Sequence, residues 1–453
     1  MYDSDAKRLV TREIEYTPAL YKIFDEILVN ATDHKQRCKA MKRIAITIDP
    51  DRNEISVFND GTGIPVCKHK SWGTYVIEGI FGHLLCGSNF NDNKAKTTGG
   101  RNGYGAKLTN VYSKRFVVET YSYKDKKTYK QVWRNNMSEC SNPVIKDIAK
   151  SALRKNASYT KITFRPDLKR FKMTKLDDDI VALMTKRCYD AAAVSHCEVT
   201  LNGVPIQVKS FEQYVKMVLP AQAAEQNKIV SKTINKRWEI AVTLSPDSSF
   251  KQISFVNGIA TTKGGTHVKA IESQILKHLV SVMSKKAKSL GLKVTKNSIR
   301  NHLFICVNCL VENPSFDSQT KEQLTTPPAN FGSTCDLPKS TLKQIAGMSS
   351  CVHHSRVREH FNQKNNTRTH THTHPFRSRH RNCGSHHTSC NIQSQEQCST
   401  ECEQDQTFAW YQEIGRREQC GYVVQFEDIT LSMTKTQNIN ARTQVHFEVR
   451  NVR

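Results

Sequence analysis

The feature that most limits what this chain can fold into is a change of character near residue 350. Before that point, apolar residues recur with helix and strand periodicity, and Gly-rich connections separate the segments. After it, apolar periodicity is nearly absent until Phe408, and Thr369 to Pro375 is a His-Thr alternation, THTHTHP. We therefore expect packed domains in residues 1–348 and a disordered tail at 349–453.

Charge and composition exclude several classes of protein. The 67 Lys and Arg residues outnumber the 42 Asp and Glu, which gives a formal net charge of +25. Such an excess favours a polyanionic partner, first of all nucleic acid, although a solvated basic surface would give the same balance. No apolar run approaches the ~18 residues that a membrane span needs. The 15 Cys without an apolar signal core indicate reduced thiols rather than a disulfide framework.

The first segment with chemical content is TPALYKIFDEILVNATD at residues 17–33. Apolar residues from Leu20 to Leu28 follow i, i+3, i+4, i+7, i+8 spacing, which predicts an amphipathic helix. Glu26 and Asn30 are one turn apart and project side by side, and Asp33 extends this polar row. A carboxylate beside a carboxamide can orient a water molecule and ligate a hard cation such as Mg²⁺. Taken alone, the pattern is more typical of a solvated helix face.

A strand pair follows this helix. IAITID at 44–49 and EISVFN at 54–59 each alternate apolar and polar residues. The second strand ends in NDGTGIP at 59–65, where Gly61 and Gly63 permit a sharp turn and a close approach to a ligand. Asn59 stands directly before that turn, where its amide can hydrogen-bond a planar base edge. Ordinary tight turns use the same residues.

A Gly-rich loop then runs into a second helix within residues 87–113. The glycines stand at 99, 100, 103 and 105, and the helix is predicted to open with Ala106-Lys107-Leu108. Free backbone N–H groups at such a junction suit phosphate, and Lys107 would add a positive charge. The loop is neither a Walker A motif nor in the setting of a dinucleotide fingerprint. A flexible surface loop would show the same glycines.

Three motifs taken together resemble those of the GHKL ATPase family. They are E-x-x-x-N at Glu26–Asn30, N-x-G-x-G at Asn59–Gly63 and the glycine-rich loop at Gly99–Lys107. The strings LYKIFDEILVNA, GGRNGYGAKL, ISFVNGIATTKGGTHV and NPSFDSQTKEQL are closer still to the type II DNA topoisomerases of eukaryotes, over nearly all of residues 1–350. The resemblance implies an α+β fold: a GHKL (Bergerat-type) mixed sheet with helices on one face, then a smaller α/β transducer domain. The implied domains are 1–197 for the ATPase, 198–348 for the transducer and 349–453 for an unrelated tail.

The same resemblance implies roles for individual residues. By the family pattern, Glu26 is the general base for ATP hydrolysis, Asn30 holds Mg²⁺ and Asn59 meets the adenine. Gln319 and Lys321 are expected to reach the γ-phosphate from the second domain. The other residues implied in ATP binding are Gly61, Gly63, Gly87, Ser88, Asn89, Gly100, Arg101, Asn102, Gly103, Tyr104, Gly105, Ala106, Lys107 and Thr320.

The second domain is expected to carry strands, one long helix and DNA-binding lysines. EVTLNGVPIQV predicts a hairpin with Asn202-Gly203 at its turn, and WEIAVTLS, QISFVNGIA and HLFICVNCLVENP predict strands. Residues 267–288 predict a long amphipathic helix. Lys285, Lys286 and Lys288 at its end match a basic loop that touches DNA in the family, although a solvated helix end carries lysines too.

The function implied is that of the ATP-binding and hydrolysing gate of a type II DNA topoisomerase, which passes one duplex through a transient double-strand break in another. The implied partners are double-stranded DNA and a second copy bound through the ATPase domain, in the nucleus and without a membrane. The family's N-terminal arm, its E-G-D-S-A and D-x-D segments and its winged-helix tyrosine are not found. We therefore expect at most a DNA-stimulated ATPase. A mismatch-repair or chaperone ATPase, and a DNA-binding or dimerisation fragment without turnover, are the alternatives.

The tail suggests two further hypotheses. A zinc site from Cys383, Cys390, Cys398 and Cys402 is disfavoured, because no C-x-x-C pair is present. A wrong reading frame or mis-splicing explains the tail better, since a CA-dinucleotide repeat encodes alternating His and Thr. In addition, QEIGRREQCG back-translated and shifted by one nucleotide gives KLDDANNAG, which looks like a family segment downstream of the transducer.

Overall fold

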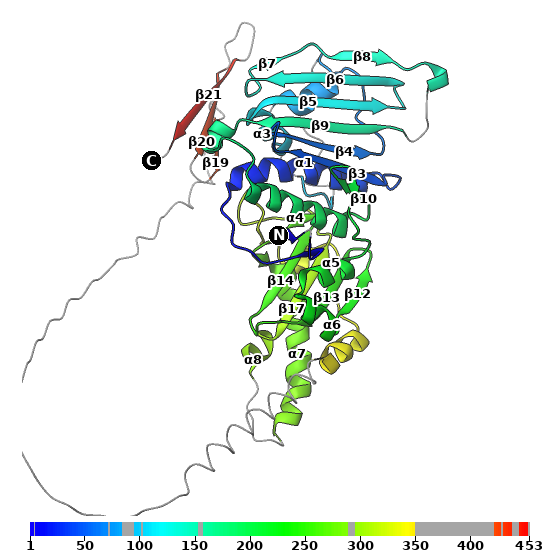
Figure 1. Ribbon diagram of the computed structural model, residues 1–453, viewed down its shortest axis with the longest axis vertical. Coiled ribbons are helices and arrows are strands. Elements are labelled where there is room, and N and C mark those ends of the chain that lie inside the picture. The colour runs from blue at the N-terminus through cyan, green and yellow to red at the C-terminus, as the bar shows by residue number, and fades with distance from the viewer. Residues whose placement is uncertain are drawn as a thin grey trace, which may run out of the picture. The chain divides into compact units, whose positions relative to one another are not determined.

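The structure is a computed structural model that describes residues 1–3, 5–70, 73–83, 95–100, 103–152, 157–288 and 295–348, together with three strands within 421–451. The chain divides into two units, residues 1–355 and 356–453. The first unit contains two large sheets, the helices that cover them and two small two-stranded sheets (Figure 1). A two-stranded ribbon of β1 (Tyr2–Asp3) and β2 (Arg8–Leu9) precedes them.

A nine-stranded sheet forms the first domain. Its strands are β3 (Arg43–Asp49), β4 (Glu54–Asp60), β5 (Ser113–Ser122), β6 (Lys127–Arg134), β7 (Glu139–Cys140), β8 (Val144–Asp147), β9 (Tyr159–Pro166), β10 (Glu198–Leu201) and β11 (Val204–Pro205). They follow the order β11-β10-β3-β4-β9-β5-β6-β7, with β8 paired to β6. β10 runs parallel to β3 and the other pairs are antiparallel, so the sheet is mixed, as predicted.

Helices cover one face of this sheet. They are α1 (Pro18–Arg37), α2 (Val76–Gly82), α3 (Gly105–Val111) and α4 (Asp178–Ser195), with single turns of 3-10 helix at Lys150–Ala152 and Leu168–Phe171. α1 contacts α3, α4 and β4, so it lies in the middle of the layer. It begins at Pro18, and the hydroxyl of the preceding Thr17 makes no capping bond and lies 3.6 Å from Met173 Sδ. This central helix carries the predicted Glu26–Asn30 pair.

The second domain is a five-stranded sheet in the order β12-β13-β17-β14-β15. The strands are β12 (Val230–Asn235), β13 (Trp238–Leu244), β14 (Lys251–Val256), β15 (Ile259–Ala260) and β17 (Leu303–Cys309). The accompanying elements are α5 (Phe211–Val218), α6 (Ala221–Gln226), α7 (Thr266–Lys288), α8 (Lys296–Arg300), a helix over 339–348, the pair β16 (Gly264–Gly265) and β18 (Gln323–Leu324), and a 3-10 turn at Pro328–Asn330. α7 packs on β17 through an apolar cluster that includes Ile271 and Ile275. The predicted long helix and strands are therefore present, and QISFVNGIA is a strand, turn and second strand.

The hairpin predicted to open the second domain lies in the first sheet. Its turn is the predicted Asn202-Gly203, but β10 pairs in parallel with β3 over Glu198 to Leu201. A boundary drawn by sheet membership would fall after Pro205 rather than at 197/198. The reason is that β10 finds its hydrogen-bond partner in β3, more than 150 residues earlier, which local patterning does not reveal.

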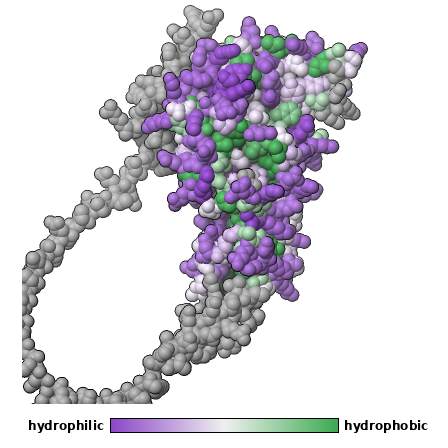
Figure 2. Space-filling model, in the orientation of Figure 1, coloured by the Kyte–Doolittle hydropathy of each residue, from purple (hydrophilic) through white to green (hydrophobic). Residues whose placement is uncertain are grey.

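Hydrophilic side chains cover most of the described surface on the face seen in Figure 2, and hydrophobic ones gather near its middle. Within the described residues, no helix combines the length and the apolar character needed to cross a membrane. In the second unit, β19 (Gly421–Phe426), β20 (Ile429–Thr436) and β21 (Gln444–Asn451) form an antiparallel sheet. These three strands are the described part of the tail that the sequence predicted to be disordered, and the cysteines of the zinc hypothesis lie outside the described residues.

Candidate active site

A cavity of about 270 Å³ lies between α1, strands β4 and β9, and the start of α3. The second domain closes part of it with Gln319 and Lys321. Residues from six separate stretches of chain meet in its wall: Glu26, Ile27, Asn30, Ala31, Asp33, His34, Arg37, Val57, Asn59, Gly63, Ile64, Ile80, Phe81, Gly100, Gly103, Tyr104, Gly105, Ala106, Lys107, Thr160, Ile162, Gln319 and Lys321. The cavity thus gathers the three sequence motifs in one place.

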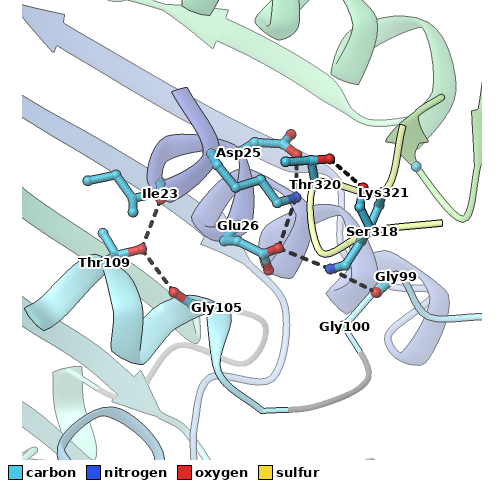
Figure 3. A network of polar contacts seen from close by, with 12 residues as sticks. Ile23, Asp25, Glu26, Gly99, Gly100, Gly105, Thr109, Ser318, Thr320 and Lys321 are labelled. Atoms are coloured by element: carbon cyan, nitrogen blue, oxygen red, sulfur yellow. Dashed lines mark hydrogen bonds and ion pairs between the residues drawn. The ribbon is translucent and has the colours of Figure 1, made fainter. Parts of the chain in front are cut away.

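Glu26 is the charged centre of the cavity wall (Figure 3). Its side chain is only 5% exposed, and its Oε1 lies 2.9 Å from Lys22 Nζ and 3.0 Å from Lys321 Nζ. Burial by itself would raise the pKa of Glu26, but the two ammonium groups outweigh it and lower the pKa to about 2. Glu26 is therefore a carboxylate at neutral pH, held between a cation of its own helix and one from the second domain.

The glycine that opens α3 makes room for Glu26. A Cβ on Gly105 would lie 2.1 Å from Glu26 Oε2, so no other residue type fits without displacing the carboxylate. The Thr109 hydroxyl fixes this junction, 2.9 Å from the carbonyl oxygen of Ile23 and 3.1 Å from that of Gly105 (Figure 3). Lys107, 2% exposed, donates from Nζ to the carbonyl oxygen of Gly103 at 2.7 Å. α3 starts at Gly105, one residue before the predicted Ala106.

Another part of the cavity wall is mostly apolar, with the amide of Asn59 and the hydroxyl of Thr160 as polar groups. Val57, Ile64, Ile80, Phe81 and Ile162 form that part of the wall. Asn59, which is 7% exposed, stands among them at the end of β4, and its Nδ2 donates to the carbonyl oxygen of Asp60 at 2.8 Å. A slot with mostly apolar walls and a few polar groups suits a planar heterocycle, and the charged end suits an anion. The whole cavity therefore fits a molecule with a flat ring at one end and negative charge at the other.

Asn30 and Asp33 supply oxygen atoms between the two ends. A Cβ on Gly100 would lie 3.4 Å from both Asn30 Oδ1 and Asp33 Oδ2, so both side chains face this glycine. An amide oxygen is a hard donor of the kind that Mg²⁺ prefers. No group of three His, Cys, Asp or Glu that could hold a metal occurs within the described ranges. A cation here would take most of its ligands from the bound molecule and water.

Most predicted site residues that the structure describes lie in the cavity wall, namely Glu26, Asn30, Asn59, Gly63, Gly100, Gly103, Tyr104, Gly105, Ala106, Lys107, Gln319 and Lys321. Gly61 is not among the wall residues, and a Cβ there would lie 2.5 Å from the ring of the wall residue His34. Thr320 is not among them either, and its hydroxyl lies 2.7 Å from Ser318 Oγ. The remaining predicted residues fall outside the described residues: Gly87, Ser88, Asn89, Arg101 and Asn102.

Sequence reasoning missed three features of the site, one beside the cavity wall and two in it. Lys22 pairs with Asp25 and Glu26, and its i, i+4 spacing to Glu26 was a usable signal. Asp33 was noted as part of a polar row but was not assigned to the site. Thr160 had no local signal, since it enters the wall by pairing with Asn59 across β4 and β9. The predicted DNA-binding lysines 285, 286 and 288 belong to the last turns of α7.

Comparisons with known proteins match both domains. The model of the histidine kinase-, DNA gyrase B- and HSP90-like ATPases matches residues 15–169, and the DNA gyrase B model matches residues 210–347. DNA topoisomerase 2 of Arabidopsis thaliana is 49% identical over 360 residues, which is 78% of this chain and 24% of that protein. Human DNA topoisomerase 2-alpha is 48% identical over 351 residues, 77% of this chain and 22% of that protein. The chain spans about a quarter of the length of these curated relatives.

Solved structures match over most of their length. The ATPase and transducer domains of DNA topoisomerase II from Balamuthia mandrillaris share 47% identity with a TM-score of 0.73, over 80% of this chain and 90% of that chain. The ATPase region of Saccharomyces cerevisiae topoisomerase II shares 43% identity with a TM-score of 0.72, over 79% and 90%. The mixed sheet, the helices on one face and the smaller second domain predicted from the sequence are therefore confirmed.

Proposed function

Because this chain belongs to the type II DNA topoisomerase family and corresponds to its ATPase and transducer region, we propose that it binds and hydrolyses ATP to operate a DNA gate. The observation that carries the proposal is the 3.0 Å contact between Lys321 Nζ and Glu26 Oε1. These residues are 295 positions apart and belong to different domains. The site is therefore complete only when the second domain lies against the first, so that nucleotide chemistry and domain position depend on each other.

The cavity suggests how ATP would lie. The adenine would occupy the apolar slot beside Asn59, and the phosphates would extend past Asn30 towards Glu26 and Lys321. Lys107 and the backbone N–H groups of the glycine-rich segment would neutralise phosphate charge. The Asn30 oxygen fits Mg²⁺, which would supply charge neutralisation to the phosphates when bound. The glycines at 100, 103 and 105 allow the backbone to come close to the ligand.

Glu26 would act on the attacking water. Since its pKa is about 2, it is a weak base, suited to orienting water and accepting the proton late. Phosphoryl transfer tolerates this, because it depends mainly on alignment and on stabilising charge on the phosphoryl oxygens. We expect Lys321 to turn from Glu26 to the γ-phosphate when ATP is present. That exchange would withdraw one of the two cations that lower the Glu26 pKa and make it a stronger base with substrate bound.

The partners follow the same proposal. Lysines at the end of α7 would touch double-stranded DNA through its phosphates, without reading sequence. Two copies would associate through the ATPase domains around a captured duplex. The larger enzyme would pass one duplex through a double-strand break in another, in the nucleus.

Turnover measurements on the full chain test the proposal. We expect ATP hydrolysis that DNA stimulates and that Glu26→Gln lowers by about 100-fold or more, with nucleotide binding retained. Glu272→Gln on α7, where Glu272 pairs with Arg300 at 2.6 Å, is the matched control and should leave turnover unchanged. Salt-sensitive DNA binding without any ATP turnover would contradict the proposal and support a DNA-binding fragment instead.

A further inference from the structure

Residues 95–100, here called the flap base, run between the two domains and contact both. On the second-domain side, the Asn313 N–H donates to the Lys96 carbonyl oxygen at 2.9 Å, and the Lys96 N–H lies 3.3 Å from Asn313 Oδ1. Asn257 Nδ2 donates to the carbonyl oxygen of Thr98 at 3.3 Å. The flap base is thus bonded at two places to a domain that lies more than 150 residues further along the chain.

On the first-domain side, Asp33 of α1 holds the end of the flap base. Its Oδ1 accepts the Gly99 N–H and its Oδ2 accepts the Gly100 N–H, both at 2.8 Å. Asp33 is 3% exposed, so these bonds form away from water. A single carboxylate that accepts two successive backbone N–H groups fixes the orientation of both peptides. Gly99 is also packed tightly, since a Cβ there would lie 2.9 Å from Ile259 of β15 and 3.0 Å from Val29 of α1.

Asn257 ties the flap base to the core of the second domain. It is 3% exposed and has a φ of +52°, in the turn between β14 and β15. Its Oδ1 accepts the Val311 N–H at 2.8 Å and its Nδ2 donates to the Val311 carbonyl oxygen at 2.9 Å. The same amide therefore joins Thr98 to the chain that leaves β17. This connection does not use Lys321.

We propose that Asp33 and Asn257 are positioning residues that clamp the flap base between the two domains, as a second link between nucleotide pocket and transducer beside Lys321. The inference rests on the proposed function for its consequence, since the flap base leads into the glycines of the cavity. A movement of the transducer that displaces Asn257 would also displace Thr98, to which it is hydrogen-bonded. Because Asp33 holds the neighbouring Gly99 and Gly100 N–H groups, the displacement would change the position of Gly100 relative to Asn30. The coupling is reciprocal, so a nucleotide that fixes Gly100 also fixes the transducer.

Asp33→Asn tests the first-domain side of the clamp. The amide keeps one acceptor oxygen and places an NH₂ group against the second glycine N–H, so one buried N–H loses its partner. We expect amide hydrogen exchange at Gly99 and Gly100 to quicken by about tenfold and the KM for ATP to rise by about tenfold, with kcat changed less than about threefold. Asp167→Asn, at a carboxylate 4% exposed that accepts from Asn136 in the same domain, is the matched control and should change neither.

Asn257→Asp tests the second-domain side of the clamp, because aspartate has the same shape as asparagine but lacks the Nδ2 donor. Asn202→Asp is its matched control, because Asn202 also has a positive φ before a glycine and also bonds a neighbouring strand through its amide. We expect Asn257→Asp to quicken exchange at Gly99 and Gly100, and Asn202→Asp to leave it unchanged. In the double variant Asp33→Asn/Asn257→Asp, the two effects should be less than additive, since both release the same segment.

The outcomes separate this inference from the proposed function. Unchanged exchange at Gly99 and Gly100 in both variants would overturn the clamp, whether or not the chain hydrolyses ATP. If Asp33→Asn does not fold, exchange in Asn257→Asp decides alone. A chain without ATP turnover would contradict the proposed function, and faster exchange in the variants would still support the clamp.

Discussion

The helices α1 and α7 have similar amphipathic sequences and opposite surroundings. α7 buries one stripe, formed by His267, Val268, Ile271, Ile275, Leu276 and Leu279, against its sheet. α1 is buried almost all round between Lys22 and Asp33. Its apolar side packs under the first sheet, and its polar side faces the cavity and the second domain. The same periodicity therefore gives a helix with one covered face in one domain and a helix enclosed on all sides in the other.

The difference shows what an enclosed polar face requires. On α1, Lys22 pairs with both Asp25 and Glu26. Arg187 of α4 adds a 2.7 Å contact to Asp25 and donates to the carbonyl oxygen of Gly258. These charges remain ionised only because each has a partner. On α7, His267 is a buried polar residue, and burial lowers its pKa to about 3, so it is neutral. Its Nδ1 has no hydrogen-bond partner among the described residues.

The largest expected effect is on stability, from removing one cation of the α1 network. Lys22→Met leaves Asp25 and Glu26 buried with one cation fewer, which should lower the free energy of unfolding by about 3 kcal/mol. Urea denaturation of the full chain measures it. The matched change on the exposed side of α7, Lys277→Met, should stay within about 0.5 kcal/mol. Equal effects in the two variants would remove the distinction between the helices.

His267 predicts acid sensitivity in the second domain. Its native pKa of about 3 lies below the ordinary value of about 6.5. As the pH falls below about 6.5, the unfolded chain therefore binds a proton at His267 and the native state does not, so the free energy of unfolding decreases. Between pH 7 and 5 this should cost about 2 kcal/mol. In His267→Gln that part of the pH dependence should vanish, whatever the absolute stability. Parallel curves for the two proteins would show that His267 is not the responsible group.

Asp33 predicts the opposite sign in the first domain. Burial raises its pKa to about 6, against the lowering influence of the Gly99 and Gly100 N–H groups, Arg37 and Lys321. The native state therefore binds a proton more tightly than the unfolded chain does. This contribution grows as the pH falls from 7 to 5, by about 1 kcal/mol, and is lost as the pH rises through about 6. Denaturation curves of Asp33→Asn between pH 7 and 5 should not show this pH-dependent contribution to the free energy of unfolding. If the variant keeps the contribution, Asp33 is not the group responsible for it.

The smallest effect is expected at the end of α7. Replacing Lys285, Lys286 and Lys288 together by Gln should lower the slope of log K for duplex DNA against log salt by up to about three, since each phosphate contact contributes about one. Lys269→Gln/Lys277→Gln on the same helix, both at exposed positions, is the control. Binding isotherms at several salt concentrations measure the slope. An unchanged slope in the triple variant would place the DNA contact elsewhere.

Local patterns predicted the elements well. The stripe from Leu20 to Leu28 predicted α1, the alternation at 44–59 predicted β3 and β4, and Asn202-Gly203 predicted a hairpin, because these features depend on neighbours within a turn or a strand. The packing partners of each element were harder to predict from the sequence. The polar row of α1 was more typical of a solvated face, and the hairpin at Asn202 was expected to open the second domain.

By itself, the sequence determined the helices, the strands, the glycine turns and the positions of Glu26 and Asn30 on one face of a helix. Only the tertiary structure decided that this face is buried, that Lys321 meets Glu26, and that Asp33 holds Gly99 and Gly100. The physical reason is the distance along the chain over which residues interact. Periodicity reflects contacts within one turn of helix or one strand, while a charge buried on α1 depends on partners hundreds of residues away that come close only when both domains have folded.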